Sequence, residues 1–280
     1  MPVWPDARST DRNEAELMRG LVGKVIVVAA GGTTPGKAAL GSATAQRLAE
    51  EGAKVLVGDL RMELAETTVA AINRAGGEAT AWEFDAADEP SVQALLDAAV
   101  TTYGGLDGVH SNAMDMSAEA IGEDGLHTIT TLPLSVWQRS LDVGLTGFFL
   151  VARAAIPHLV ERGGGSIVGT ASGAVFAGEP IRLAYATAKT GMGAIIRHVA
   201  SAYGQKGIRA NLVAPGFVPG QESLDNMTDD HRKAMTRISR SGRMGFPDDI
   251  ASAVTFLLSD DASWINGQIL SVDGGTVFGR

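Results

Sequence analysis

Seven short runs of apolar, often β-branched residues alternate with longer helical segments between residues 24 and 272. Consecutive parallel strands need a long crossover, and a helix is the usual one. Strands that are apolar along their whole length are buried on both faces. The pattern therefore predicts an α/β protein with a doubly wound parallel sheet. The predicted strands are 24–30, 53–58, 79–84, 108–112, 166–171, 209–213 and 268–272, and the predicted helices are 43–51, 63–74, 91–103, 135–162, 183–204 and 247–259.

No repeat and no linker-like stretch interrupts this alternation, so we expect one Rossmann-type domain over residues 21–280. Residues 1–20 are polar and predict a loose N-terminal arm with a short helix at 14–19. Two irregular stretches, 114–133 and 217–245, follow strand ends. Ligands of such sheets bind at the carboxyl ends of the strands, so both stretches are predicted to wall a pocket, with plain surface connections as the alternative.

Composition narrows the classes of partner and compartment. The formal net charge of −9, without a run of lysine or arginine, argues against nucleic acid and anionic membranes. There is no cysteine, so no disulfide or thiolate site is expected. No apolar run approaches the roughly 18 residues of a membrane span, and no signal segment is visible, which predicts a soluble cytoplasmic protein. The five histidines lack metal-ligand spacing, so no metal is expected and each histidine is predicted to be an ordinary surface or packing residue.

A hydroxyl, a phenol and an ammonium are spaced so that they can meet at one point. Tyr185 and Lys189 are four residues apart in a predicted helix, which places them one turn apart on the same face. Ser172 directly follows a predicted buried strand. Because the carboxyl ends of such strands are where ligands bind, these three residues are the candidate catalytic residues.

Proton transfer coupled to hydride transfer suits this trio. A free tyrosine has a pKa near 10, and moving it to about 7 requires roughly 4 kcal/mol of preference for the phenolate. One ammonium about 4 Å away supplies on the order of 4 kcal/mol at an effective dielectric constant of about 20. Lys189 is thus sufficient to make Tyr185 a general acid/base, while Ser172 can hydrogen-bond the substrate oxygen. Such a tyrosine–lysine spacing alone is more often an ordinary helix surface, so the assignment depends on the flanking motifs.

A glycine-rich turn follows the first predicted strand. Residues 31–38 read G-G-T-T-P-G-K-A, close to the phosphate loop of nucleoside-triphosphate-binding proteins, but Ala38 replaces the hydroxyl that would ligate magnesium. Extending the turn to Gly41 predicts a dinucleotide site instead, in which backbone N–H groups approach a pyrophosphate at a helix N-terminus. Asp59 ends the second predicted strand, where a carboxylate accepts hydrogen bonds from the adenosine ribose.

With these motifs in place, residues 21–275 resemble a short-chain dehydrogenase/reductase. The matching stretches keep the order of that family: L-V-G-K-V at 21–25, the glycine turn, Asp59, Asp85, S-N-A at 111–113, Ser172, Y-A-T-A-K at 185–189, R-A-N-L-V-A-P-G at 209–216, G-R-M-G-F-P-D-D-I-A at 242–251 and N-G-Q-I-L-S-V-D-G-G at 266–275.

The resemblance implies NAD(P)-dependent interconversion of a secondary alcohol and a ketone. It implies that Tyr185 is the acid/base, that Lys189 lowers the pKa of Tyr185 and binds the nicotinamide ribose, and that Ser172 holds the substrate oxygen. It also implies a homotetramer. The implied cofactor-binding residues are Gly31, Leu40, Gly41, Asp59, Leu60, Asp85, Ala86, Asn112, Ala113, Tyr185, Lys189, Pro215, Gly216 and Val218.

The chain departs from the family pattern at four places. The turn carries about four extra residues within 32–38, which form either a longer cradle over the pyrophosphate or a loop into solvent. Met114 replaces a glycine, Gly144 stands where the family has a catalytic asparagine, and Gly220 stands at a threonine. We expect water to fill the space at Gly144, with substrate access as the alternative.

Asp59 favours NAD over NADP because its carboxylate would face the 2′-phosphate, although Arg61 and Lys37 could oppose this preference. The leading function is therefore an NAD-dependent alcohol dehydrogenase or ketone reductase. The alternatives are an NAD-binding protein without turnover and an enzyme that uses the trio without redox chemistry. A largely apolar substrate is expected from the residues of the irregular stretches and nearby loops, namely Met114, Met116, Phe176, Leu183, Phe217, Leu224 and Met227.

Overall fold

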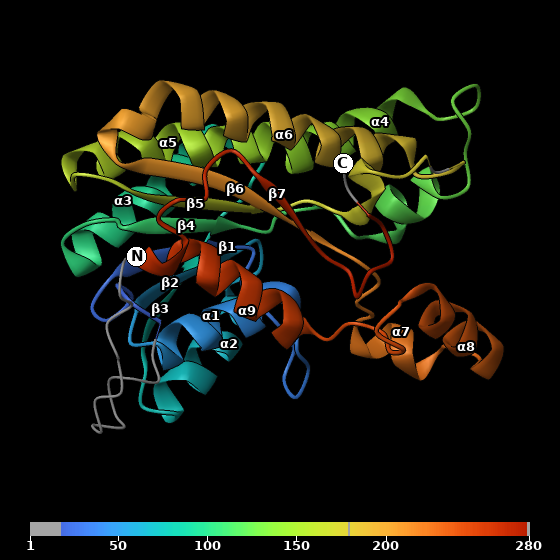
Figure 1. The fold of residues 1–280 in the computed structure, drawn as a ribbon, viewed down its shortest axis with the longest axis horizontal. Helices are drawn as coiled ribbons and strands as arrows, with labels where there is room; N and C mark the ends of the chain where they lie inside the picture. The colour runs from blue at the N-terminus through green and yellow to red at the C-terminus, as the bar shows by residue number, and fades with distance from the viewer. Residues whose placement is uncertain (1–17, 179, 279–280) are drawn as a thin grey trace, which may run out of the picture.

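The computed structural model describes residues 18–178 and 180–278. Its strands are β1 (Val25–Ala29), β2 (Lys54–Asp59), β3 (Glu78–Glu83), β4 (Gly108–Ser111), β5 (Gly165–Thr170), β6 (Ile208–Pro215) and β7 (Ile269–Val272). They form one seven-stranded parallel sheet in the order β3-β2-β1-β4-β5-β6-β7 (Figure 1). The chain reverses its direction of travel across the sheet between β1 and β4, which is where such folds bind ligands. The predicted fold class is confirmed.

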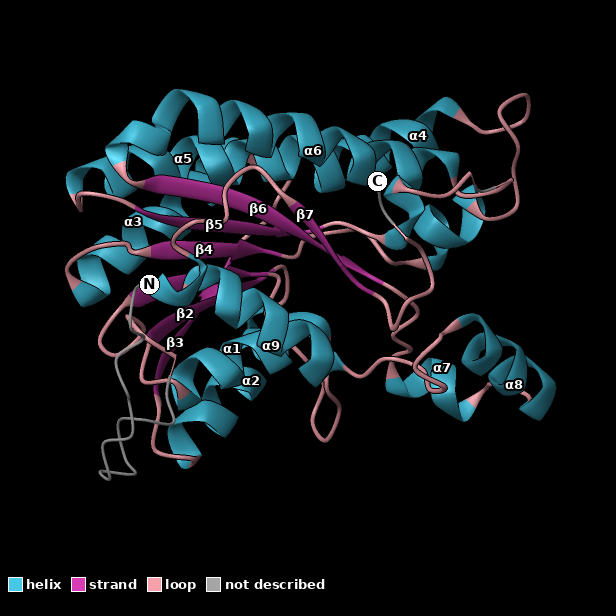
Figure 2. Ribbon diagram, viewed as in Figure 1, coloured by secondary structure: helices cyan, strands magenta, loops and turns pink. Residues whose placement is uncertain are grey.

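Helices cover both faces of the sheet (Figure 2). One layer holds α3, α5 and α6 with the short α4, and the other holds α1, α2 and α9. The pair α7 and α8 stands apart, beyond the carboxyl ends of the strands. The helices are α1 (Leu40–Glu50), α2 (Met62–Arg74), α3 (Glu89–Tyr103), α4 (Leu134–Leu141), α5 (Gly147–Glu161), α6 (Leu183–Tyr203), α7 (Gln221–Asp225), α8 (Asp229–Ile238) and α9 (Pro247–Leu258).

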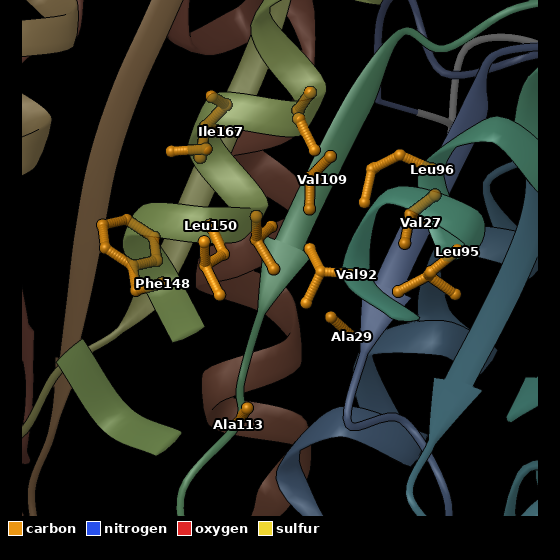
Figure 3. Packing of buried hydrophobic residues seen from close by; sticks show 14 of the residues in the cluster. Val27, Ala29, Val92, Leu95, Leu96, Val109, Ala113, Phe148, Leu150 and Ile167 are labelled. Atoms are coloured by element: carbon orange, nitrogen blue, oxygen red, sulfur yellow. The ribbon is translucent and has the colours of Figure 1, made fainter. Parts of the chain in front are cut away.

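Alternate residues of each central strand enter opposite cores. Val27 and Ala29 of β1 pack with α3 and α5, whereas Ile26 and Val28 pack with α1 and α9. Figure 3 shows the first of these cores, in which side chains from α3 and α5 meet those of the strands. Phe148 of α5 is the largest fully buried side chain. Burying a side chain of this kind contributes about 1.5–3 kcal/mol, so the two cores hold the strand ends in fixed positions.

A buried carboxylate ties the amino-terminal edge of the sheet together. Asp107 accepts hydrogen bonds from the Val25 N–H at 2.9 Å and from the Arg162 guanidinium at 3.0 Å. Burial opposes the charged form, but the bonds from Arg162 and Val25 and the charge of Lys24 hold the pKa of Asp107 below its ordinary value. This cluster fixes β1 relative to α5 at the end of the sheet opposite the strand carboxyl ends.

The regular elements follow the predictions closely, and three segments differ. The helix predicted at 135–162 is divided into α4, a π-helical turn (Asp142–Thr146) and α5. The stretch 217–245, predicted as irregular, contains α7 and α8. The stretch 114–133 contains a π-helical turn at Ala118–Gly122. The predicted arm and its short helix lie outside the described residues except for 18–20.

The continuous helical segment Leu134–Glu161 is long and apolar enough to span a membrane by length and composition alone. Of its most apolar window, 56% is buried inside the protein, which is what a core helix requires. Its apolar character is therefore explained by packing against α3, α6 and the sheet.

Candidate active site

A cavity of about 340 Å³ lies at the carboxyl ends of the strands. It joins the predicted catalytic trio to the glycine turn and to the loops after β4 and β6. The predicted site residues that line it are Leu40, Asn112, Ser172, Tyr185, Lys189, Pro215, Gly216 and Val218. Further lining residues are Ala38, Ala39, Met114, Met116, Thr170, Ala171, Pro219, Gly220 and Pro247.

The trio comes from two neighbouring elements. Tyr185 lies in the first turn of α6, and Lys189 lies one turn further along the same helix. Ser172 follows β5 and begins a short 3₁₀ turn, where its hydroxyl oxygen accepts the Ala174 N–H at 3.2 Å. The hydroxyl proton of Ser172 is not used in that bond, so it is available for a substrate oxygen.

Lys189 is a buried ammonium, with a relative exposure of 2%. Its Nζ donates a hydrogen bond of 2.8 Å to the carbonyl oxygen of Thr170, at the end of β5. Burial lowers the pKa of Lys189 to about 8. The Lys189 side chain is therefore still mainly charged at neutral pH. It lies one helical turn after Tyr185.

His110 of β4 reaches the same strand end from within the sheet. It is fully buried, and its Nε2 lies 2.8 Å from the Thr170 hydroxyl. Burial and the charge of Lys189 lower its pKa to about 3, so the imidazole is neutral near pH 7. The prediction of an ordinary surface or packing residue missed this link. The position of His110 in the sequence, between the apolar Val109 and the S-N-A motif at 111–113, was the signal that could have indicated this contact.

The glycine turn packs closely against the ends of β1 and β2. A Cβ at Gly41 would lie 2.0 Å from the Ala30 carbonyl oxygen, so only glycine fits there. The Gly31 N–H bonds the Gly58 carbonyl at 2.9 Å, which holds the turn against β2. The N-terminus of α1 then faces the cavity at Leu40. An open helix N-terminus behind a glycine turn is a good pyrophosphate site.

Asp59 lies where a ribose would be expected. One carboxylate oxygen accepts the Gly32 N–H at 3.0 Å, and the other accepts the Arg61 N–H at 3.3 Å. Each oxygen has a second acceptor position. Backbone N–H groups therefore orient this carboxylate before any ligand binds. Its remaining acceptor positions fit the ribose of a nicotinamide dinucleotide.

The inserted residues project away from the turn. Residues 34–39 are exposed, and the Thr33 hydroxyl donates to the Lys37 carbonyl at 3.0 Å, which closes a small loop. Figure 1 shows this loop extending below α1. The exposed tip of the loop favours the alternative in which the inserted residues extend into solvent. Ala38 and Ala39, where the loop leads back to α1, line the cavity.

The predicted cofactor residues Leu60, Asp85, Ala86 and Ala113 do not line the cavity. Leu60 follows β2 and is exposed, while Asp85 follows β3 and accepts the Ala87 N–H at 2.8 Å. Ala86 and Ala113 are buried. Asn112 lines the cavity and donates to the Ala30 carbonyl at 3.2 Å, so it also supports the glycine turn.

Met114 occupies the space beside Gly144. A Cβ at Gly144 would lie 2.7 Å from the Met114 sulfur and 3.2 Å from the Ala188 Cβ. The expected water-filled gap is wrong for this structure, because a thioether fills that space. Met114 and Gly144, thirty residues apart in the sequence, therefore form one packing arrangement.

The apolar residues proposed for the substrate divide into three groups. Met114 and Met116 line the cavity, as expected. Phe217 instead lines a smaller neighbouring cavity that reaches Met235 of α8. Pro219 and Pro247 also form part of the wall of the main cavity, and neither was predicted from the sequence. Around Gly220 a Cβ would meet open space. Phe176, Leu183, Leu224 and Met227 are not among the residues that line the main cavity.

Two residues other than glycine have left-handed backbone among those described, and both border this site. They are Ala30, with φ 65°, and Arg182, with φ 61°. Such a conformation costs an L-residue roughly 1–2 kcal/mol. Ala30 sets the turn after β1, and Arg182 directly precedes the helix of Tyr185 and Lys189. Strain of this kind persists where the surrounding contacts hold it.

Comparisons with known proteins agree with this geometry. A family model described as Enoyl-(Acyl carrier protein) reductase matches residues 36–277. The chain is 37% identical over 262 residues to a 2,5-dichloro-2,5-cyclohexadiene-1,4-diol dehydrogenase of Sphingobium indicum, covering 92% of this chain and 98% of the relative. It is 36% identical to a cis-4-hydroxycyclohexanecarboxylate dehydrogenase of Sinomonas cyclohexanicum, covering 84% of this chain and 91% of the relative.

A solved structure extends the likeness to three dimensions. The fold matches a 7α-hydroxysteroid dehydrogenase complexed with NADH and 7-oxo glycochenodeoxycholic acid, with a TM-score of 0.82 and 30% sequence identity. The match covers 92% of this chain and 95% of that chain.

The contact between Met114 and Gly144 predicts a coupled pair of substitutions. Gly144→Asn should reduce the free energy of unfolding by about 1–3 kcal/mol, because the new side chain must displace the Met114 thioether. With Met114→Ala in the same chain, the cost of Gly144→Asn should fall by about 1 kcal/mol or more. Urea unfolding of the wild type, both single variants and the double variant measures this coupling. Additive effects would contradict the packing described.

The buried Lys189 predicts a pH-dependent stability. Its pKa is about 8 in the folded protein and 10.5 ordinarily, so the unfolded chain binds more protons between these values. The contribution of Lys189 to stability should therefore rise as pH rises from about 8 towards 10.5, and be lost as pH falls through 8. We expect the free energy of unfolding of the wild type, minus that of Lys189→Met, to increase over that range in urea titrations. A constant difference would show that Lys189 has an ordinary pKa.

Proposed function

Because this chain belongs to the short-chain dehydrogenase/reductase family, we propose that it is an NAD-dependent dehydrogenase that interconverts a secondary alcohol and a ketone by hydride transfer. The observation that carries the proposal is that one cavity is lined both by Ser172, Tyr185 and Lys189 and by residues of the glycine turn. Such a cavity can bring an alcohol carbon and a dinucleotide together. The relatives are named alcohol and diol dehydrogenases, which supports an oxidoreductase.

Tyr185 is the general base for alcohol oxidation and the general acid for ketone reduction. Its phenolate takes the hydroxyl proton of the alcohol as the hydride leaves the carbon, and in the reverse direction its phenol returns the proton. The Lys189 ammonium, held by the Thr170 carbonyl, stabilises the phenolate. Ser172 donates its free hydroxyl proton to the substrate oxygen, which fixes the distance between that oxygen and Tyr185.

A bound nicotinamide dinucleotide supplies the hydride acceptor. The turn that contains Gly31 and Gly41 would hold its pyrophosphate at the N-terminus of α1, and Asp59, oriented by the Gly32 N–H, would accept hydrogen bonds from its adenosine ribose. Asn112, Pro215 and Gly216 lie at the cavity, where its nicotinamide end would be held. Asp85 and the neighbouring Ala86 are proposed to border the adenine.

We infer that the substrate is a small, largely apolar ring that carries a secondary hydroxyl. Met114, Met116, Val218, Pro219 and Pro247 supply an apolar wall to the cavity of about 340 Å³. Two relatives are named for alcohols on six-membered rings. Such a ring offers one hydroxyl for Ser172 and Tyr185 and apolar carbons for the wall.

A cofactor-binding protein without turnover is the second candidate. It is favoured by the thioether that occupies the space at Gly144, where the family carries an amide. The two candidates differ in one measurement. The wild-type protein either forms NADH from NAD and a panel of cyclic secondary alcohols, or binds NADH and forms none. NADH absorbance and fluorescence report the two properties separately.

The proposal predicts the behaviour of a variant that lacks the phenol oxygen. Tyr185→Phe should lose turnover by a factor of at least about 1,000, because the base is removed and the proton has no acceptor. NADH binding, measured by fluorescence, should change less than about threefold. Tyr203→Phe is a matched control, since Tyr203 lies at the far end of the same helix. Retention of more than a tenth of wild-type turnover by Tyr185→Phe would reject the assignment.

Asp59 predicts a preference for NAD. Its carboxylate would repel the 2′-phosphate of NADP, so kcat/KM should be at least about tenfold higher with NAD. Asp59→Asn should reduce that ratio, because the amide lacks the charge and keeps the shape. Glu63→Gln, on the exposed first turn of α2, controls for a general change in surface charge. A wild-type preference for NADP would show that Lys37 and Arg61 outweigh the acid.

A further inference from the structure

The helix of Tyr185 and Lys189 begins without a capping side chain of its own. The residue before α6 is Arg182, which has a left-handed backbone conformation. Its side chain makes no capping hydrogen bond to the first turn of the helix. The first N–H groups of any helix have no partner within the helix. In α6 these groups belong to the turn that contains Tyr185, so whatever binds them also determines where Tyr185 lies.

The missing cap comes from a residue sixty positions earlier in the chain. One carboxylate oxygen of Asp124 accepts the Ala184 N–H at 3.1 Å, and the other accepts the Tyr185 N–H at 2.8 Å. The Asp124 carbonyl also accepts the Arg182 N–H at 3.1 Å. These three bonds define the first turn of α6 from outside the helix.

Asp124 is fully buried, with a relative exposure of 0%. A buried carboxylate is tolerated when it is hydrogen-bonded, and the positive end of a helix dipole favours its charge. Bonds from N–H groups to a carboxylate are among the strong ones in proteins. Water cannot readily replace them at a site without solvent access, so the contact is directional and stiff.

The segment that carries Asp124 also forms part of the cavity wall. Asp124 lies two residues after the end of the π-helical turn Ala118–Gly122, and Met114 and Met116 lie just before that turn. The Tyr185 backbone and the apolar wall are therefore linked through one side chain. A shift of the segment would move both the proton acceptor and the surface against which a ring would pack.

We propose that Asp124 is a positioning residue for the acid/base reaction, and that it holds Tyr185 and the cavity wall in a fixed mutual geometry. Asp124 does not reach the reacting atoms and transfers no proton. Its effect is to keep the phenol oxygen at the distance that hydride and proton transfer require. The inference rests on the proposed dehydrogenase function for its kinetic consequence, and on the capping geometry alone for its structural one.

Two variants test the proposal. Asp124→Ala removes both acceptors, and Asp124→Asn keeps the shape but offers one acceptor oxygen. With a cyclic secondary alcohol, kcat per NADH-binding site should fall at least about 20-fold in Asp124→Ala and less in Asp124→Asn, because small displacements of catalytic groups have large effects on rate. The Kd for NADH should change less than about threefold in both variants. Normalising to NADH-binding sites removes any loss that comes from misfolded protein.

The matched control is Glu123→Gln, which removes the neighbouring carboxylate. Glu123 is partly exposed, and its carboxylate lies 3.4 Å from the imidazole of His127. It should retain kcat within about twofold. If the wild type is active and Asp124→Ala keeps kcat within threefold, the proposal is overturned. A loss of NADH affinity as large as the loss of kcat would also overturn it, because it would indicate a general structural role.

Hydrogen–deuterium exchange decides the anchoring without any substrate. The amides of Ala184 and Tyr185 should exchange at least about tenfold faster in Asp124→Ala, with the exchange of the sheet amides unchanged. Unchanged exchange at these two amides would overturn the proposal. If the wild type shows no turnover with the alcohol panel, the proposed function fails, and this measurement still decides whether Asp124 anchors Tyr185.

Discussion

The parallel direction of all seven strands is the constraint on which the site depends. Parallel pairing brings every carboxyl end to the same edge, and the helical crossovers return the chain to the opposite edge each time. Residues that follow strands therefore meet, although they are far apart in the sequence. Ala30 follows β1, Asn112 follows β4, Ser172 follows β5 and Gly216 follows β6. The cavity is the space that the ends of β4, β5 and β6 enclose with residues 38–40 of the glycine turn and with α6.

Several buried charges in this protein each bind at least one backbone group. Asp107 and Asp124 accept backbone N–H groups, and Lys189 donates to a backbone carbonyl. A carbonyl is a dipole without net charge, so the bond orients the ammonium of Lys189 and leaves its positive charge in place. That charge acts in a region of low dielectric constant, where it influences nearby groups more strongly than in water. Together with burial, which is the larger cause, this charge lowers the pKa of His110.

Much of the fold was predictable because its causes are local. Runs such as Val25–Ala29 are apolar throughout, and glycines or proline mark the ends of several helices. The position of Tyr185 relative to Lys189 follows from helical spacing, so their presence at one cavity was also predictable. The break between α4 and α5 was not, because its flanking residues continue a helical pattern without interruption.

The contacts that were not predicted from the sequence join residues that lie far apart along the chain. Asp124 looked like one acidic residue in a polar loop, and only the path of the chain places it at the start of α6. The water expected at Gly144 followed from treating that position alone. The occupant is Met114, which enters from the loop after a different strand. Short-range patterns predict elements, whereas such pairs depend on how the elements pack.

The shared volume of Met114 and Gly144 also constrains how this chain can have changed over time. A long side chain at 114 and a side chain at 144 compete for one space, so the fitness effect of either depends on the other. While Met114 is present, a larger residue at 144 is opposed, and a larger residue at 144 would likewise oppose a methionine at 114. The pair is therefore epistatic, and a relative with a larger side chain at 144 should have a smaller one at 114.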